Sequence, residues 1–425
     1  MKLTLRTLPL MVLAAILLAG CGNRTLVQAP FVLMHEGAAA FDRTPEPFRA
    51  PCMTIFYVTD RAVDKETENG PRYGYQRSHQ ITWGTADVRV WPNTTWANFV
   101  TDSTTVPRRH AYRLDVSRVT PGKTVKSVGS RLEVEDGRLV IPGEAYEIYE
   151  QEKAALHAAL APWIDVGATD AIVYVHGFTT TFDQAVIRTG EIWHYTGRTM
   201  IPIAYTWPAG SGSGLFGYTR DRESSEFTVS HLKMFLDMLR SHPSIERIHI
   251  VSHSRGTDVA STAIREMHMV ARRGDYTVAD DLKIATLVLA APDLDTDVFN
   301  QRFFGELAAM APGRLTIYFS PRDSAIGLAS MLFGSELRVG ELSVEDFPPQ
   351  AREVLSQLPT VECIVCEVSG FGSRHSYVFD NPSVLSDLVL LLRDGATPGH
   401  GRPLEQPAPG IWRITNDYGR AGWEN

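Results

Sequence analysis

The residue types best suited to covalent chemistry lie at 252–256, where the sequence is Ser-His-Ser-Arg-Gly. This stretch joins an apolar, strand-like run at 248–251 to a helical pattern. The pattern Gly-x-Ser-x-Gly at such a junction is typical of a nucleophile elbow, a sharp turn that presents the serine at a sheet edge. Ser252 stands where this motif has its first glycine, and we expect a small residue to be tolerated there. We predict that Ser254 is a nucleophile; the alternative is a serine that only caps or stabilises the turn.

A reactive serine in an elbow is followed along the chain first by an acid and then by a histidine. Three histidines follow Ser254. His268 lies about four turns along the next helix, roughly 20 Å away, and His400 lies in a tail rich in proline and glycine. His375 follows the last predicted strand and precedes the last helix, at the same sheet edge as the serine. We predict that His375 is the general base; the alternative is a histidine on a surface loop.

The acid of such a site lies at the carboxyl end of a strand, where it fixes the histidine tautomer. Asp323 follows the strand predicted at 314–319 and is our first candidate. Asp293 and Asp295 follow the strand before it. They remain alternatives because some relatives of this architecture carry the acid one strand earlier. The sequence therefore predicts a Ser-His-Asp triad with three candidates for its acid.

Acyl transfer also requires donors for a developing oxyanion. The strand two before the elbow strand ends in Val-His-Gly-Phe. We predict that the backbone N–H groups of Phe178 and Arg255 are the donors, with Gly177 allowing a close backbone approach. His176 and His253 are expected to support the two turns and not to react. The alternative for the His-Gly pair is a plain turn.

Apolar strands that alternate with amphipathic helices must position these residues. This alternation predicts an α/β fold, a doubly wound and mostly parallel sheet with helices on both faces. Runs at 53–59 and 81–90 indicate antiparallel first strands at one sheet edge, and 91–145 is interpreted as an insertion packed on that edge. The other predicted strands are 171–175, 200–205, 245–251, 283–290, 314–319 and 361–368, and the predicted helices are 146–160, 182–195, 223–240, 257–271, 297–309 and 382–393.

The first residues have the pattern of a secretion signal. Basic residues precede an apolar run at 8–18, and the small residues after it end in Cys21. This end resembles the lipobox of bacterial lipoproteins, which implies removal of 1–20 and acylation of Cys21. By the same resemblance, Gly22 implies the outer membrane, with the protein facing the periplasm. The alternative is an ordinary signal peptide or an uncleaved anchor.

The rest of the composition is that of an ordinary globular protein. Lys and Arg number 41 against 49 Asp and Glu and are scattered, so no nucleic-acid partner is expected. We interpret 21–50 as a polar tether, 51–395 as the globular domain and 396–425 as a loosely packed tail rich in proline and glycine.

Three cysteines remain after Cys21, so at least one is unpaired. Cys363 and Cys366 lie in an apolar run, where a strand would place them too far apart for a disulfide, and are expected in the core. A redox pair or half of a zinc site is the alternative. The sequence leaves open whether Cys52 is paired, and no metal or other cofactor is expected.

Six segments together resemble a bacterial family of α/β-hydrolases of unknown function, within the esterase/lipase superfamily, over about 55–393. The resemblance implies the α/β-hydrolase fold and a serine-hydrolase constellation, without a substrate. Methionine is common in that family where Arg255 stands here. The segments are Phe56-Tyr57-Val58-Thr59-Asp60-Arg61, Val175-His176-Gly177-Phe178, Tyr205-Thr206-Trp207-Pro208, His253-Ser254-Arg255-Gly256, Ala290-Ala291-Pro292-Asp293-Leu294-Asp295 and His375-Ser376-Tyr377.

These observations predict a serine hydrolase, a carboxylesterase that works through an acyl-enzyme. The loops at 208–222 and 325–359 lack the pattern of an amphipathic lipase lid, which favours small or medium acyl esters as substrates. Two alternatives stay open: a catalytically silent, membrane-anchored binding or scaffold lipoprotein, and an acyltransferase on the same fold.

Overall fold

The computed structural model describes eight stretches of the chain. Residues 1–23, with the predicted signal peptide and Cys21, lie outside them, as does most of the helix predicted at 297–309. The described residues are 24–127, 131–210, 212, 215–271, 282–301, 313–323, 338–370 and 375–419.

The described residues contain the strands of one central layer and of two small two-stranded sheets. They are β1 (Arg24–Thr25), β2 (Met53–Thr67), β3 (Gly70–Trp91), β4 (Arg113–Val125), β5 (Glu133–Glu135), β6 (Arg138–Val140), β7 (Asp170–Val175), β8 (Ile201–Thr206), β9 (Arg247–His253), β10 (Ile284–Ala290), β11 (Leu315–Phe319), β12 (Val361–Glu367), β13 (Thr397–Pro398), β14 (Gly401–Arg402), β15 (Glu405–Ala408) and β16 (Ile411–Thr415).

Helices cover this layer. They are α2 (Phe31–Glu36), α3 (Trp96–Ser103), α4 (Gly143–Ala159), α5 (Ala161–Ile164), α6 (Phe182–Tyr195), α7 (Leu215–Arg240), α8 (Gly256–Ala271), α10 (Thr296–Phe299), α12 (Pro349–Ser356), α13 (Tyr377–Asp380) and α14 (Pro382–Asp394). Local capping explains where several begin. A capping box between Thr181 and Gln184 starts α6, and the Asn381 side chain followed by Pro382 starts α14.

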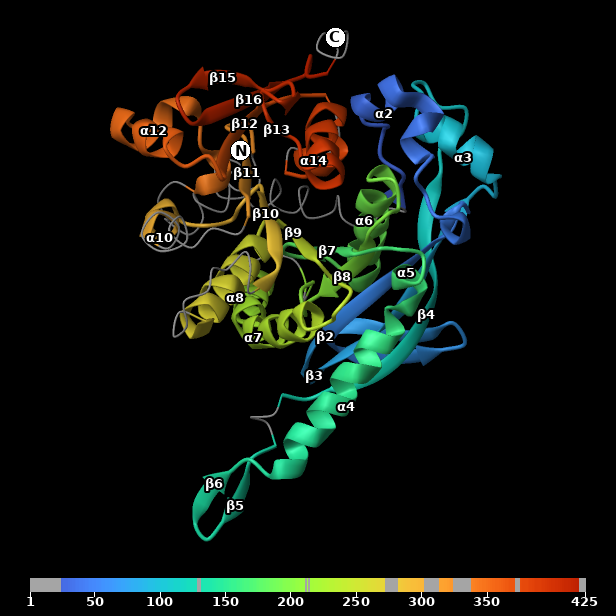
Figure 1. Ribbon diagram of the computed structural model, residues 1–425, viewed down its shortest axis with the longest axis vertical. Coiled ribbons are helices and arrows are strands. Elements are labelled where there is room, and N and C mark those ends of the chain that lie inside the picture. The colour runs from blue at the N-terminus through green and yellow to red at the C-terminus, as the bar shows by residue number, and fades with distance from the viewer. Residues whose placement is uncertain are drawn as a thin grey trace, which may run out of the picture.

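One sheet runs through the described part of the chain in the order β1-β4-β3-β2-β8-β7-β9-β10-β11-β12-β16-β15. Neighbouring strands are parallel from β2 to β16, and β3 is antiparallel to β2, as predicted for this edge. Helices α7 and α8 lie on one side of the sheet, and α6 and α14 lie on the other (Figure 1). The doubly wound α/β architecture is therefore confirmed. Its parallel strands are buried and apolar because both faces are covered.

The region expected as an insertion takes part in the sheet. β4 extends the antiparallel edge beyond β3, whereas the β5–β6 hairpin and the first part of α4 project from the body (Figure 1). Helix α7 also begins at Leu215, before the predicted residue 223, so part of the glycine-containing loop is helical.

The amino-terminal segment differs from the expected tether. Its apolar residues Phe31, Val32 and Leu33 are buried in α2, and the Val32 N–H donates to Ser386 Oγ of α14 over 3.2 Å. A short apolar face within a mostly polar stretch gives this segment a place in the core.

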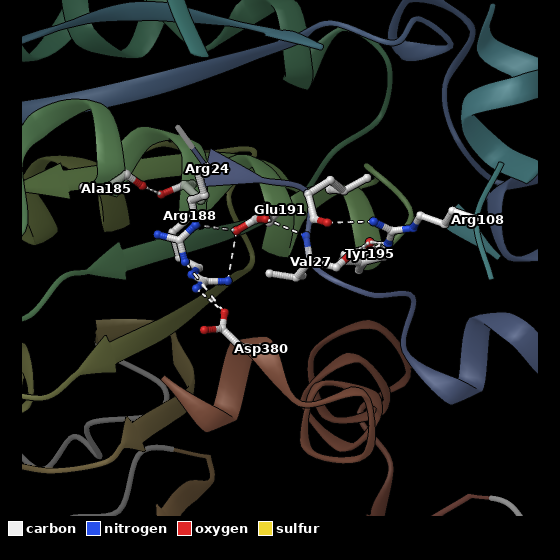
Figure 2. Close-up of polar contacts among 10 residues, drawn as sticks. Arg24, Val27, Arg108, Ala185, Arg188, Glu191, Tyr195 and Asp380 are labelled. Carbon is white, nitrogen blue, oxygen red and sulfur yellow. Dashed lines mark hydrogen bonds and ion pairs between the residues drawn. The ribbon is translucent and has the colours of Figure 1, made fainter. Parts of the chain in front are cut away.

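Ion pairs fix the same segment further upstream (Figure 2). Glu191 of α6 accepts from the Val27 N–H at 3.0 Å and lies 3.2 Å from the Arg24 guanidinium. Arg188 bridges Glu191 and Asp380, at 2.9 and 2.6 Å. Burial raises the pKa of Glu191 to about 7, against the lowering effect of Arg24. The network joins the amino-terminal residues to α6 and to the end of α13.

The carboxyl-terminal tail is also folded, contrary to the expectation of loose packing. β16 pairs with β12 and widens the parallel sheet. Arg402 is completely buried and donates two hydrogen bonds to Asp387 and one to Glu362. The Tyr418 hydroxyl donates to Asp387 at 2.6 Å. A buried charge network therefore attaches the tail to α14 and β12.

Two of the cysteines lie in the core, as predicted. Cys363 and Cys366 are buried and unpaired in β12, and Cys52 is exposed and unpaired. Within the described ranges, no helix combines the length and apolar composition needed to cross a bilayer.

Candidate active site

Ser254 occupies a strained turn between β9 and α8. Its φ of 52° lies in the left-handed region, which a serine adopts only when its surroundings hold it there. The Ser254 N–H donates to the Ala290 carbonyl at 2.9 Å, and the Ser254 carbonyl accepts from the Thr257 N–H at 3.0 Å. These bonds hold the turn at the carboxyl edge of the sheet, the geometry of a nucleophile elbow.

Two glycines allow the elbow to touch the end of β7. A Cβ at Gly256 would lie 2.4 Å from the His176 carbonyl oxygen, and a Cβ at Gly177 would lie 2.7 Å from Ser254 Cβ. Neither distance is possible for a real side chain. Ser252, where a glycine was looked for, donates from Oγ to the Val288 carbonyl at 2.7 Å and fits between β9 and β10.

His375 and Asp323 are hydrogen-bonded. Nδ1 of His375 donates to Oδ2 of Asp323 over 2.8 Å, and Asp323 is buried just beyond the end of β11. The His375 carbonyl accepts from Nε2 of His253, at 3.1 Å, and the two rings are 4.8 Å apart between centroids. His375 therefore contacts the residue that precedes Ser254. Its side chain is 21% exposed and remains accessible.

Charges around the two histidines separate their roles. Burial lowers the pKa of His375, but the charge and hydrogen bond of Asp323 and the charge of Asp293 outweigh this and raise it above its ordinary value. Burial and the neighbouring His375 lower the pKa of His253 to about 3, so this ring is neutral and unsuited to accept a proton.

The two alternative acids have other partners. Asp293 forms an ion pair with Arg338 at 2.8 Å. Asp295 caps α10, because its side chain accepts from the N–H groups of Asp297 and Val298. Of the three candidate carboxylates, Asp323 is the one that the structure joins to His375.

The two expected oxyanion donors each follow a residue of the contact between Gly177 and Ser254. Phe178 follows Gly177, which packs against Ser254, and Arg255 follows Ser254 itself. The Arg255 side chain points to α7, where Nε donates to Ser225 Oγ at 3.1 Å, and it also pairs with Asp258 at 3.0 Å. The cation beside the serine is thus neutralised and engaged in packing.

Two residues of the site were not anticipated as important. Arg61 is buried against the β7–α6 loop and donates to the Thr180 carbonyl at 2.7 Å. Asp221 of α7 accepts from the N–H groups of Thr179 and Gly210, at 3.3 and 2.9 Å. A signal for Arg61 existed in the sequence: a charged pair, Asp60-Arg61, directly follows the apolar core of a strand.

The remaining histidines downstream of the serine do not join the site. His268 is buried along α8, and His400 forms a bridge with Thr397 in the tail. No group of metal-binding side chains is found in the part of the chain that the structure describes.

The doubly wound fold, the elbow at Ser254 and the hydrogen-bonded His375 and Asp323 are the features of an α/β-hydrolase. Comparison with known families agrees: residues 153–393, more than half of the chain, match the family described as "Alpha/beta hydrolase of unknown function (DUF900)". The chain belongs to this family, which confirms the resemblance inferred from its motifs. No match to the chain is found among curated proteins.

Proposed function

We propose that this α/β-hydrolase is a serine hydrolase that cleaves carboxylic esters through a Ser254-His375-Asp323 triad. The observation that carries the proposal is the His375–Asp323 hydrogen bond of 2.8 Å, together with the contact of His375 with His253, the residue before a serine in a left-handed elbow. Chain order, buried carboxylate and raised histidine pKa all agree with this assignment.

The proposed reaction has two halves. His375 takes the proton of Ser254 as its Oγ attacks the acyl carbonyl, and Asp323 stabilises the imidazolium that forms. The N–H groups of Phe178 and Arg255 hold the oxyanion while the alcohol leaves with a proton from His375. Water then attacks the acyl-enzyme by the same route and releases the acid.

Small or medium acyl esters suit the surroundings of the serine. Ser254 is only 5% exposed, and Arg255 beside it is held by Ser225 and Asp258. Such a recessed serine favours an ester that extends one narrow acyl chain into the site over a bulk lipid surface.

The proposal is tested by the hydrolysis of p-nitrophenyl acetate, butyrate and octanoate. Ser254→Ala should reduce kcat/KM by about 10³-fold or more. Ser252→Ala is a matched control, since its Oγ bonds to Val288 within the sheet and it should keep the wild-type rate within about threefold. A folded Ser254→Ala variant with the parental rate would refute the triad. Acyl transfer to an added alcohol in place of hydrolysis would instead indicate an acyltransferase.

We also propose that the protein is a lipoprotein of the bacterial outer membrane, anchored through Cys21 and facing the periplasm. The proposal rests on the small residues that end in Cys21 after the apolar run at 8–18. Incorporation of labelled palmitate that disappears in Cys21→Ser would support the anchor. Equal incorporation in both would refute it.

A further inference from the structure

Arg61 is a buried cation whose hydrogen bonds go to backbone and imidazole groups of three chain segments. Its NH1 donates to the carbonyls of Gly74 and Ala209 at 2.9 and 2.8 Å. Its NH2 donates to the Thr180 carbonyl at 2.7 Å and to Nε2 of His176 at 3.2 Å. The residue is 3% exposed, and burial lowers its pKa to about 10, so it stays charged at neutral pH. Burying an arginine is costly, and these bonds, with the nearby charges of Asp60, Asp221 and Asp183, offset that cost.

The bond from Arg61 fixes the tautomer of His176. Nε2 accepts from the guanidinium, so the ring proton is on Nδ1, which donates to the Gly177 carbonyl over 2.9 Å. Burial and the charge of Arg61 lower the pKa of His176 far below its ordinary value, which keeps the ring neutral. The ring stacks on Trp207, with centroids 5.1 Å apart and planes 8° from parallel. Trp207 in turn donates to the His176 carbonyl at 2.7 Å.

The hydrogen bond from His176 Nδ1 to the Gly177 carbonyl sets the direction of the next N–H group, that of Phe178. In a trans peptide, the C=O and N–H of one unit point in opposite directions. The Gly177 carbonyl is directed to the His176 ring, so the Phe178 N–H points in the opposite direction within the same peptide plane, away from that ring. Gly177 packs directly on Ser254, with 2.7 Å between its ideal Cβ position and Ser254 Cβ. The peptide that carries the Phe178 N–H is therefore held both in place and in orientation.

The loop around this peptide is strained and needs such support. Thr179 has a φ of 55°, a conformation that a threonine rarely adopts. Arg61 binds the next carbonyl, that of Thr180, and Asp221 binds the Thr179 N–H. The Ala209 carbonyl and the Gly210 N–H bind the same two side chains, so the β7–α6 and β8–α7 loops are tied together.

We propose that Arg61 is a positioning residue for the oxyanion hole: through His176 it orients the Gly177–Phe178 peptide so that the Phe178 N–H faces the oxyanion formed at Ser254. This inference rests on the proposed function and adds a residue outside the matched range, 153–393, to its machinery. Donors fixed before the reaction stabilise the transition state without reorganisation, so their loss lowers kcat more than substrate binding.

Arg61→Met removes the hydrogen bond from Arg61 to His176. His176→Phe removes the hydrogen bond from His176 to the Gly177 carbonyl but keeps a ring against Trp207. Arg198→Met is a matched control. Arg198 is likewise fully buried, and it donates to Nδ1 of His194 and to three backbone carbonyls remote from the elbow. Thermal unfolding of each variant reports the structural cost separately from catalysis.

The assays are kcat and KM for a p-nitrophenyl ester and the inhibition constant of a trifluoromethyl ketone, which forms a tetrahedral adduct with the serine. For Arg61→Met and His176→Phe we expect kcat to fall by about 10²-fold, with KM within about threefold. The inhibitor should weaken by the same factor as kcat/KM. Arg198→Met should lower the melting temperature and leave kcat within about threefold. If Arg61→Met does not fold, Arg61→Lys and His176→Phe carry the test.

The outcomes separate this inference from the proposed function. Wild-type protein that neither hydrolyses esters nor binds the ketone would overturn the proposed function and this inference with it. An active wild type whose folded Arg61 and His176 variants keep their kcat, or lose it only as much as Arg198→Met, would overturn the positioning role alone.

Discussion

Replacing Asp323 by asparagine tests the assignment of the acid. The two side chains have nearly the same shape, so the change removes the charge from a buried group 2.8 Å from His375 Nδ1. The amide can also donate to Nδ1 and thereby stabilise the tautomer that carries its proton on Nε2, where it cannot accept the serine proton. We expect kcat to fall by about 10³- to 10⁴-fold, equivalent to about 4 to 5 kcal/mol of transition-state stabilisation.

The pH dependence gives a second readout of the same change. The general base must be neutral, so activity rises as the pH increases through the pKa of His375. Asp323 raises that pKa in the wild type. Asp323→Asn should therefore shift the acidic limb of kcat/KM to lower pH, with a much lower plateau. The measurement is the rate of p-nitrophenyl butyrate hydrolysis between about pH 5 and 9.

Asp293→Asn is the matched control for this experiment. Asp293 is also buried and lies after the neighbouring strand, but its carboxylate pairs with Arg338. The charge of Asp293 raises the pKa of His375 less than Asp323 does, so Asp293→Asn should shift the acidic limb of kcat/KM to lower pH by a smaller amount. A rate within about tenfold of the wild type agrees with this role. A large loss in Asp293→Asn with little loss in Asp323→Asn would show that the acid lies one strand earlier.

Three further predictions concern packing and buried charge. Gly256→Ala places a Cβ 2.4 Å from the His176 carbonyl oxygen. This substitution should lower the unfolding free energy by about 1 to 3 kcal/mol and reduce ester hydrolysis. An unchanged melting temperature would contradict the close approach. Arg402→Met removes the arginine paired with buried Asp387 and one of the two arginines paired with Glu362, the other being Arg314, and should cost about 3 to 5 kcal/mol in urea unfolding. A loss below about 1 kcal/mol would show that the tail is not anchored. Burial raises the pKa of Glu191 from 4.5 to about 7, so the folded protein binds this proton more tightly than the unfolded chain, and wild-type unfolding free energy should fall as the pH rises through that window. Glu191→Gln should flatten that slope, and equal slopes in both proteins would refute the shift.

The core of the fold could be predicted because its signal is local. Each buried parallel strand is a short apolar run, and the helix predicted at 182–195 has the bounds of α6, which the structure shows to begin at a capping box. The predicted nucleophile comes from its motif between a strand and a helix, and the predicted base comes from chain order, which depends only on the sequence of elements. In the structure, Ser254 follows β9, and His375, which follows β12, is hydrogen-bonded to Asp323, which follows β11.

Long-range charge pairs explain where sequence reasoning differed from the structure. The proline and glycine content of the tail predicts loose packing. The structure differs because the partners of Arg402 lie far along the chain, on α14 and β12. The segment after residue 23 looked like a tether because Arg24 and Val27 gain their order from Glu191, far along the chain. Arg61 has no local pattern that reveals its acceptors, since they lie on three separate segments.

Labelling with a fluorophosphonate tests the central claim most directly, because only an activated serine reacts readily with it. The folded protein is incubated with the probe, and the adduct is located by mass mapping, with Ser254→Ala and His375→Ala as controls. We predict one adduct on Ser254, absent in Ser254→Ala and strongly slowed in His375→Ala. Folded wild-type protein that takes no label, or takes it on another residue, would contradict the proposed serine hydrolase.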